Sequence, residues 1–113
     1  MMVLDSFQPT SNAADWAEAI EVTDADTGTA LPLGDYLIEM EIMDQRRNRR
    51  VYGSSTDGTI ATTSTGFEFS FPASSMRDLR AGSYTVNIRF TDSVTGAVLE
   101  PVIANLPVIE GGF

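Results

Sequence analysis

Two groups of acidic residues in the chain have spacings that occur in chemical sites. Asp24 and Asp26 lie two residues apart before Gly28, as in the first part of a calcium-binding loop. A complete loop of this kind needs a third oxygen ligand before the glycine and a glutamate further along, and neither stands at the required spacing. A polar turn is therefore the favoured interpretation, and whether the turn holds a cation stays open.

Glu39 and Glu41 project from the same side of an expected strand, about 7 Å apart. Paired carboxylates at such spacing can serve glycoside hydrolysis. Here they alternate with apolar residues, which predicts the solvent-facing side of a strand rather than a polar cleft. The chain contains no histidine and no cysteine, so the commonest general base and the thiolate metal ligands are missing. We expect no enzyme, no cofactor, and no catalytic or metal-binding residue.

The positive charge is concentrated in one short segment. The formal net charge is -9, and four of the seven basic residues lie together: Arg46, Arg47, Arg49 and Arg50. The segment is either a solvated hairpin loop or a basic tip that docks an acidic surface. We expect no nucleic-acid partner, because no aromatic residues are interleaved for base stacking. We expect no membrane partner, because an acidic chain avoids anionic lipid and no apolar run approaches the ~20 residues of a membrane span.

The single tryptophan, Trp16, follows a polar segment rich in small residues. Residues 1–15 are expected to form an extended arm that is ordered by a partner or by lying on the sheet. Tryptophan is enriched at interface hot spots, so Trp16 is a candidate interface anchor. The alternative is that its ring belongs to the core.

Alternating apolar and polar residues predict a series of short strands. The clearest are Tyr84 to Phe90, entered through a glycine, and Tyr36 to Met43. Glu18 would fall on the apolar side of the first strand, which predicts a bulge or a short helical turn there. The other expected strands cover residues 16–22, 51–55, 60–63, 67–71 and 98–109.

The sequence also predicts two similar turns and one short helix between the strands. Residues 23–31 and 91–99 are expected to form sibling turns, each with an aspartate near its start and a glycine near its end. Residues 72–80 are the one plausible helical piece, with Ser74 or Ser75 as its cap.

Turn signals about every 8–12 residues and about seven short strands are typical of a sandwich. We therefore expect residues 16–113 to form a single all-β domain. It would be an immunoglobulin-like antiparallel β-sandwich with an extended N-terminal arm and one short helical connection. Large apolar side chains from several strands would fill the space between two sheets, among them Phe67, Phe69, Phe71, Ile38, Met40, Ile42, Val86, Ile88 and Phe90.

The order of these elements resembles a known family. The aromatic strand at 67–71, the run from Leu79 to Asp92 with its Ala-Gly-Ser-Tyr entry, and the closing Asn-Leu-Pro-Val-Ile-Glu-Gly-Gly carry the resemblance. They are similar to the small immunoglobulin-like structural proteins of tailed bacteriophages, including the N-terminal domain of baseplate upper proteins. The likeness runs from about Trp16 to Gly112 and departs at residues 31–35.

This resemblance implies a non-enzymatic structural component of a virion, made in the bacterial host cytoplasm. The tail, the baseplate, a fibre attachment or capsid decoration would be its place. Its partners would be other virion proteins, in a homo-oligomer or multi-copy assembly, and the resemblance transfers no functional residues. The alternative function is a carbohydrate- or receptor-binding sandwich domain. That function would need exposed aromatic side chains, for which Tyr52 and Phe113 are the candidates.

Overall fold

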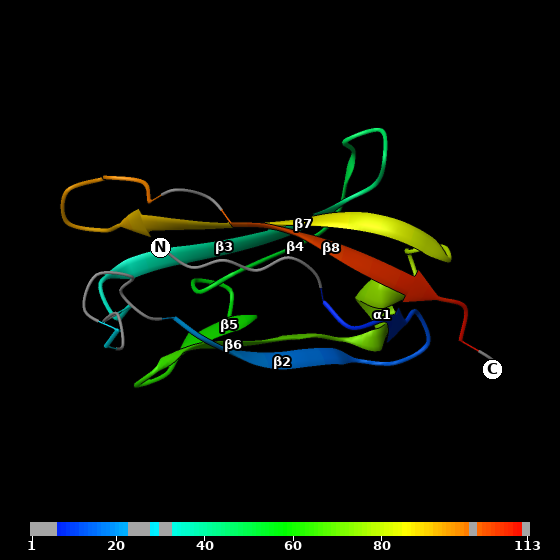
Figure 1. Ribbon diagram of the computed structural model, residues 1–113, viewed down its shortest axis with the longest axis horizontal. Helices are drawn as coiled ribbons and strands as arrows, with labels where there is room; N and C mark the ends of the chain where they lie inside the picture. The colour runs from blue at the N-terminus through cyan, green and yellow to red at the C-terminus, as the bar shows by residue number, and fades with distance from the viewer. Residues whose placement is uncertain (1–6, 23–27, 30–32, 100–101, 112–113) are drawn as a thin grey trace.

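The strands form two facing sheets in the computed structural model, which describes residues 7–22, 28–29, 33–99 and 102–111 (Figure 1). The larger sheet has the order β1-β8-β7-β3-β4 and the smaller the order β2-β6-β5. All pairings are antiparallel except that of β1 with β8. The all-β sandwich and its short helical connection are therefore confirmed. The elements are β1 (Thr10–Ser11), β2 (Trp16–Glu21), β3 (Tyr36–Met43), β4 (Arg49–Ser54), β5 (Ile60–Thr62), β6 (Gly66–Phe71), α1 (Ala73–Met76), β7 (Gly82–Asp92) and β8 (Val102–Ile109).

The core lies between the sheets and follows the period-two pattern of the strands. Buried residues recur at every second position within β3, β6 and β7, so the three phenylalanines of β6 face the aliphatic residues of the larger sheet. Burying each of these side chains stabilises the fold by roughly 1.5–3 kcal/mol. The fully buried set includes Phe67, Phe71, Ile38, Met40, Ile42, Val86, Ile88 and Leu106.

The segment before β2 lies along the sandwich. Phe7 is buried, and its ring meets the Trp16 ring edge-on with the centroids 5.1 Å apart. The Phe7 N–H donates to the Asn105 carbonyl at 2.8 Å, and β1 pairs in parallel with the end of β8. Contacts within the chain itself therefore order residues 7–15.

Strand β2 is regular, so the predicted bulge or helical turn at Glu18 is wrong. Its six residues pair in unbroken register with β6. Glu18 does lie on the same side as Trp16, but its carboxylate accepts the indole N–H at 2.7 Å. Because β2 is an edge strand of the smaller sheet, this carboxylate is only half-buried. At the edge of the sheet, a charged side chain on the core side still reaches solvent, so β2 needs no bulge at Glu18.

The helical connection is shorter than predicted, and its cap comes from elsewhere in the chain. Pro72 occupies the N-cap position, and no side-chain cap is formed there. The Asp15 carboxylate instead accepts the Ala73 N–H at 2.7 Å. The prediction of a cap by Ser74 or Ser75 is therefore wrong, because a residue 58 positions away supplies the acceptor.

The turn after β7 has the predicted geometry. The Asp92 carboxylate accepts the backbone N–H groups of Val94 at 2.8 Å and Thr95 at 3.2 Å. Gly96 then takes a φ of 75°, a conformation that favours glycine. In the sibling turn Gly28 has a φ of 70°, whereas residues 23–27, with Asp24 and Asp26, lie outside the described residues.

Candidate interaction surfaces

The turn between β3 and β4, residues 44–48, is called here the arginine tip. The Asp44 carboxylate accepts the backbone N–H groups of Arg46 and Asn48, each at 2.9 Å. The hydrogen bond from the Asn48 N–H holds the pKa of Asp44 below its usual range. Partial burial of the carboxylate opposes this effect, and the bond from the Arg46 N–H adds to it. The Arg47 N–H donates to the Asp44 carbonyl at 3.0 Å, and Arg47 adopts a φ of 63°. A single aspartate therefore fixes the backbone of the tip.

The four arginines of this hairpin divide into two kinds. Arg49 pairs with Glu41 at 2.8 Å, and Arg50 pairs with Asp44 at 3.0 Å. The side chains of Arg46 and Arg47 are exposed and have no hydrogen bond or ion pair with any described residue. Two guanidinium groups at the tip are thus free to bind an anionic group.

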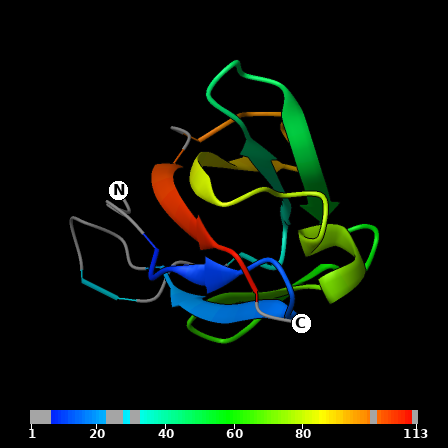
Figure 2. The ribbon, with the colours of Figure 1, turned by 90° about the vertical axis from the view of Figure 1, so that its right-hand side faces the viewer.

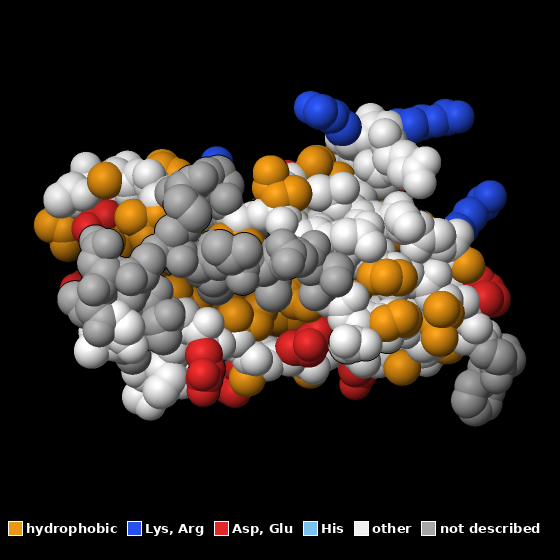
Figure 3. All heavy atoms as spheres, in the orientation of Figure 1, with side chains coloured by type: hydrophobic (Ala, Val, Ile, Leu, Met, Phe, Trp, Pro, Cys, Tyr) orange, Lys and Arg blue, Asp and Glu red, His pale blue; other side chains and the backbone are white. Residues whose placement is uncertain are grey.

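The arginine tip protrudes from the molecule. In two perpendicular views the connection between β3 and β4 rises above the larger sheet (Figure 1, Figure 2). In the space-filling view, basic side chains project from the upper edge, whereas acidic side chains lie mostly along the lower part of this face (Figure 3). On this face the projecting basic side chains therefore lie apart from most of the acidic ones.

The outer face of the larger sheet carries a second group of polar side chains, called here the polar sheet face. Glu39 stands opposite Arg89 on β7, and Glu41 stands opposite Asn87 on β7 and Tyr52 on β4. The face borders a shallow hollow of about 290 Å³, with the exposed side chain of Ile103 beside it. Its polar members are Glu39, Glu41, Arg49, Tyr52, Asn87 and Arg89.

Glu39 is the centre of the polar sheet face. The Tyr52 hydroxyl donates to one carboxylate oxygen at 2.6 Å, and Arg89 Nη2 donates to the other at 2.6 Å. The bond from Tyr52, followed by the bond from Arg89, holds the pKa of Glu39 below its usual range. The same contact with Glu39 raises the pKa of Tyr52.

The remaining members of the face are also bonded to one another. Arg49 Nε and Asn87 Nδ2 donate to opposite oxygens of Glu41, at 2.8 and 3.1 Å. The Arg49 guanidinium lies over the Tyr52 ring, 4.5 Å from its centroid. The carboxylates of this face are therefore already neutralised by neighbours within the chain.

These contacts predict a loss of stability in acid. The pKa of Glu39 is depressed in the folded state, so its contribution is present above the ordinary carboxyl pKa of about 4 and is lost as the pH falls through the folded value. Urea unfolding between pH 6 and pH 2.5 should show Glu39→Gln losing less stability on acidification than the wild type. Tyr52→Phe should show a smaller effect in the same direction. An acid-induced loss in Glu39→Gln as large as that of the wild type would contradict this assignment.

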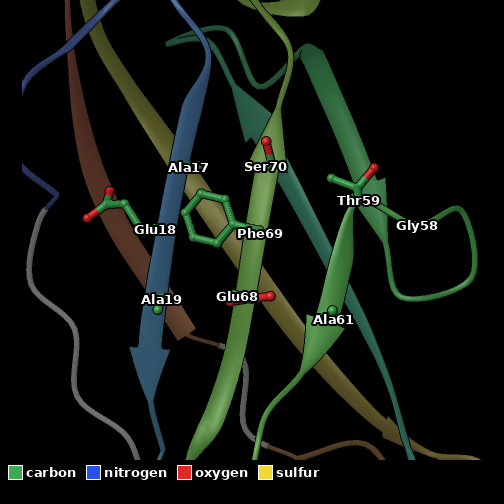
Figure 4. Close-up of a pocket in the computed structure, with 9 residues that line it drawn as sticks. All are labelled: Ala17, Glu18, Ala19, Gly58, Thr59, Ala61, Glu68, Phe69 and Ser70. Carbon is green, nitrogen blue, oxygen red and sulfur yellow. The ribbon is translucent and has the colours of Figure 1, made fainter.

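A third surface lies on the outer face of the smaller sheet and is called here the alanine groove (Figure 4). It has a volume of about 470 Å³ and is open to solvent. Ala19, Glu68 and Ala61 stand side by side in one row across β2, β6 and β5. The lining residues are Ala17, Glu18, Ala19, Gly58, Thr59, Ala61, Glu68, Phe69 and Ser70.

Glu68 is the charged side chain at the middle of the alanine groove. It is exposed and has an alanine on either side across the sheet. No described residue forms a hydrogen bond or an ion pair with its carboxylate. Unlike the carboxylates of the polar sheet face, Glu68 is therefore available to a cation from another molecule.

Trp16 was a candidate interface anchor, and the structure corrects this interpretation. Its ring is only 4 % exposed and packs against Phe69 and Phe71, with centroid distances of 4.7 and 5.8 Å. Trp16 belongs to the core because β2 covers one side of the aromatic cluster. Of the other aromatic candidates, Tyr52 is partly covered by Arg49, and Phe113 lies outside the described residues.

Two features are absent from the described residues, a cluster of metal ligands and a membrane-spanning helix. In the part of the chain that the structure describes, no three histidine, cysteine, aspartate or glutamate side chains are grouped so that they could hold a metal ion. Among those same residues, no helix has the length and apolar character needed to cross a bilayer.

No protein-family model and no curated protein matches the chain. Among solved structures, the chain is similar to CopC from Methylosinus trichosporium OB3b, with 18% sequence identity and a TM-score of 0.38. The likeness covers 75% of this chain and 85% of that one.

The expectation of a structural component of a tailed-phage particle is corrected by these findings. The likeness found is to CopC and not to a phage protein. Turn and strand signatures carried the resemblance, and such signatures recur in unrelated sandwich domains because they specify local geometry. The resemblance to the phage family stays a prediction.

Proposed function

We propose that this domain is a non-enzymatic interaction module that associates with further copies of itself through opposite charges. The observation that supports the proposal is the exposed positive charge of the arginine tip on a chain that is acidic as a whole. Two unpaired guanidinium groups project from the arginine tip, whereas the net charge of the chain is -9. The tip of one copy therefore finds a surface of opposite sign on any other copy.

The net negative charge of each copy opposes this association. The ionic strength determines whether this repulsion or the attraction at the tip is stronger. At about 0.1 M salt the Debye length is about 10 Å, which is shorter than the smallest dimension of the molecule, 26 Å. Repulsion between whole molecules is then largely screened, while a direct contact between guanidinium and carboxylate is not. At about 1 M salt the Debye length is about 3 Å, and the contact is weakened as well.

Sedimentation velocity of the full chain at ~0.1 M and ~1 M NaCl tests the proposal. Exposed ion pairs contribute only roughly 0.2–1 kcal/mol each, against the roughly 4 kcal/mol that corresponds to a Kd of 1 mM, so the association is weak and is measured at millimolar protein or above. We expect species heavier than the 12.2 kDa monomer at the lower salt and the monomer alone at the higher salt.

A pair of charge-reversal variants tests the role of the tip. Arg46→Glu with Arg47→Glu should leave only monomer at both salt concentrations, because the tip becomes acidic. Arg77→Glu with Arg80→Glu makes the same change in net charge outside the tip and should keep the association. A wild-type chain that is monomeric at ~0.1 M salt would overturn the proposal, as would a tip variant that associates like the wild type.

A further inference from the structure

We infer that the arginine tip of one copy docks in the alanine groove of the next, with Arg46 or Arg47 against Glu68. This inference rests on the self-association proposed above and names the surface that receives the tip. It assigns a role to the outer face of β2, β6 and β5, whose side chains no described element covers.

The tip protrudes from one sheet, and the groove is recessed on the outside of the other (Figure 1, Figure 4). The groove is open to solvent, so a side chain of another copy can enter it. Alanine side chains on both sides of Glu68 leave room for a long guanidinium side chain to reach the carboxylate.

The arrangement of charges favours this groove over the polar sheet face and the hollow beside the tip as the receptor of the arginine tip. On the polar sheet face, Glu39 is bonded to Arg89 and Glu41 to Arg49, so neither carboxylate needs a further cation. The hollow beside the tip itself, of about 300 Å³, is lined by Arg46 and Arg50 and would repel a second tip. Glu68 forms no ion pair with a described residue, so the alanine groove offers an unpaired carboxylate with space for the tip.

The two surfaces lie on opposite sheets of the sandwich, which determines the kind of assembly. A contact between different surfaces of identical copies is heterologous, and it builds a ring or an open chain of copies rather than a two-fold dimer. We therefore expect the mean mass to keep rising with protein concentration instead of stopping at twice the monomer mass.

Mixing variants with reversed charge tests the docking. Glu68→Arg alone should weaken association at least about tenfold at ~0.1 M salt, and the tip variant Arg46→Glu with Arg47→Glu should do the same. An equimolar mixture should regain the wild-type mean mass, because both contacts then join opposite charges: the basic tip meets the acidic groove, and the acidic tip of the tip variant meets the basic groove of Glu68→Arg. Asp78→Arg, which makes the same charge change outside the groove, should associate at least as strongly as the wild type.

The outcomes separate this inference from the proposal on which it rests. If Glu68→Arg associates like the wild type while the tip variant does not, the groove is the wrong receptor and self-association stands. If the wild type does not associate, both fail. Thermal unfolding checks that each variant is folded, and Ala61→Arg, which places a cation beside an unchanged Glu68, supplies a second test of the groove. Undiminished association of Ala61→Arg would also overturn the docking.

Discussion

Replacing Phe69 with alanine is expected to lower the free energy of unfolding by about 3–5 kcal/mol. The ring is 2 % exposed and lies at the centre of the aromatic cluster. It meets Trp16, Phe71 and Phe7 at centroid distances of 4.7, 5.7 and 6.1 Å. Truncation removes all three contacts and leaves a cavity that the paired strands cannot close without losing their register.

Urea unfolding followed by tryptophan fluorescence and by circular dichroism measures this loss. Ser70→Ala is the matched control, because Ser70 is the next residue of β6 and faces solvent. Its unfolding free energy should stay within about 0.5 kcal/mol of the wild type. A loss in Phe69→Ala no larger than in Ser70→Ala would mean that β6 presents its other face to the core.

Replacing Gly66 with alanine is the second change with a large expected effect. A β-carbon at this position would overlap the Ile20 carbonyl oxygen and would lie 2.9 Å from the Glu21 Cα. Both neighbours are backbone atoms of β2, so no side chain can turn aside. The two strands must separate at the Glu21–Gly66 pair, and overpacking of this kind costs about 1–3 kcal/mol.

Gly34→Ala is the control for this substitution. A β-carbon at Gly34 would have no heavy atom within 4 Å, so the same chemical change should leave the unfolding free energy nearly constant. Equal urea midpoints for Gly66→Ala and the wild type would contradict the close approach of β2 to β6.

The period-two pattern was sufficient to predict the strands whose two faces differ. Strand β3 begins and ends at the predicted residues, Tyr36 and Met43, because apolar and acidic residues alternate along it. The pattern failed at Glu18, where a charged residue faces inward at the edge of a sheet and accepts the Trp16 indole N–H. Alternation along one strand does not reveal whether that strand lies at an edge.

Contacts between distant residues were not predictable from local signals. The cap of α1 comes from Asp15, whereas Ser74 and Ser75, the caps predicted from the sequence, lie within the helix. The alanine groove was missed for the same reason. Its central row joins Ala19, Glu68 and Ala61 from three strands, and only the pairing of β2 and β5 with β6 brings these residues together.

The arginine tip was partly predictable. Four arginines in six residues between two strands indicated a basic hairpin loop. Which arginines are paired depends on the register of β3 with β4 and on Asp44, which forms an ion pair with Arg50 but with neither Arg46 nor Arg47. Charge composition alone could not separate the paired arginines from the free ones.

Disulfide trapping between two single-cysteine variants tests the docking of the tip most directly. The chain has no cysteine of its own, so Gln45→Cys in the tip and Ala19→Cys in the groove introduce the only thiols. At ~0.1 M salt, we predict that an oxidised equimolar mixture forms the mixed dimer well above the level given by Val94→Cys, a highly exposed site on another loop, with Ala19→Cys. High salt should abolish the excess. A yield for the Gln45 and Ala19 pair equal to that of the Val94 control would contradict the docking of the tip in the groove.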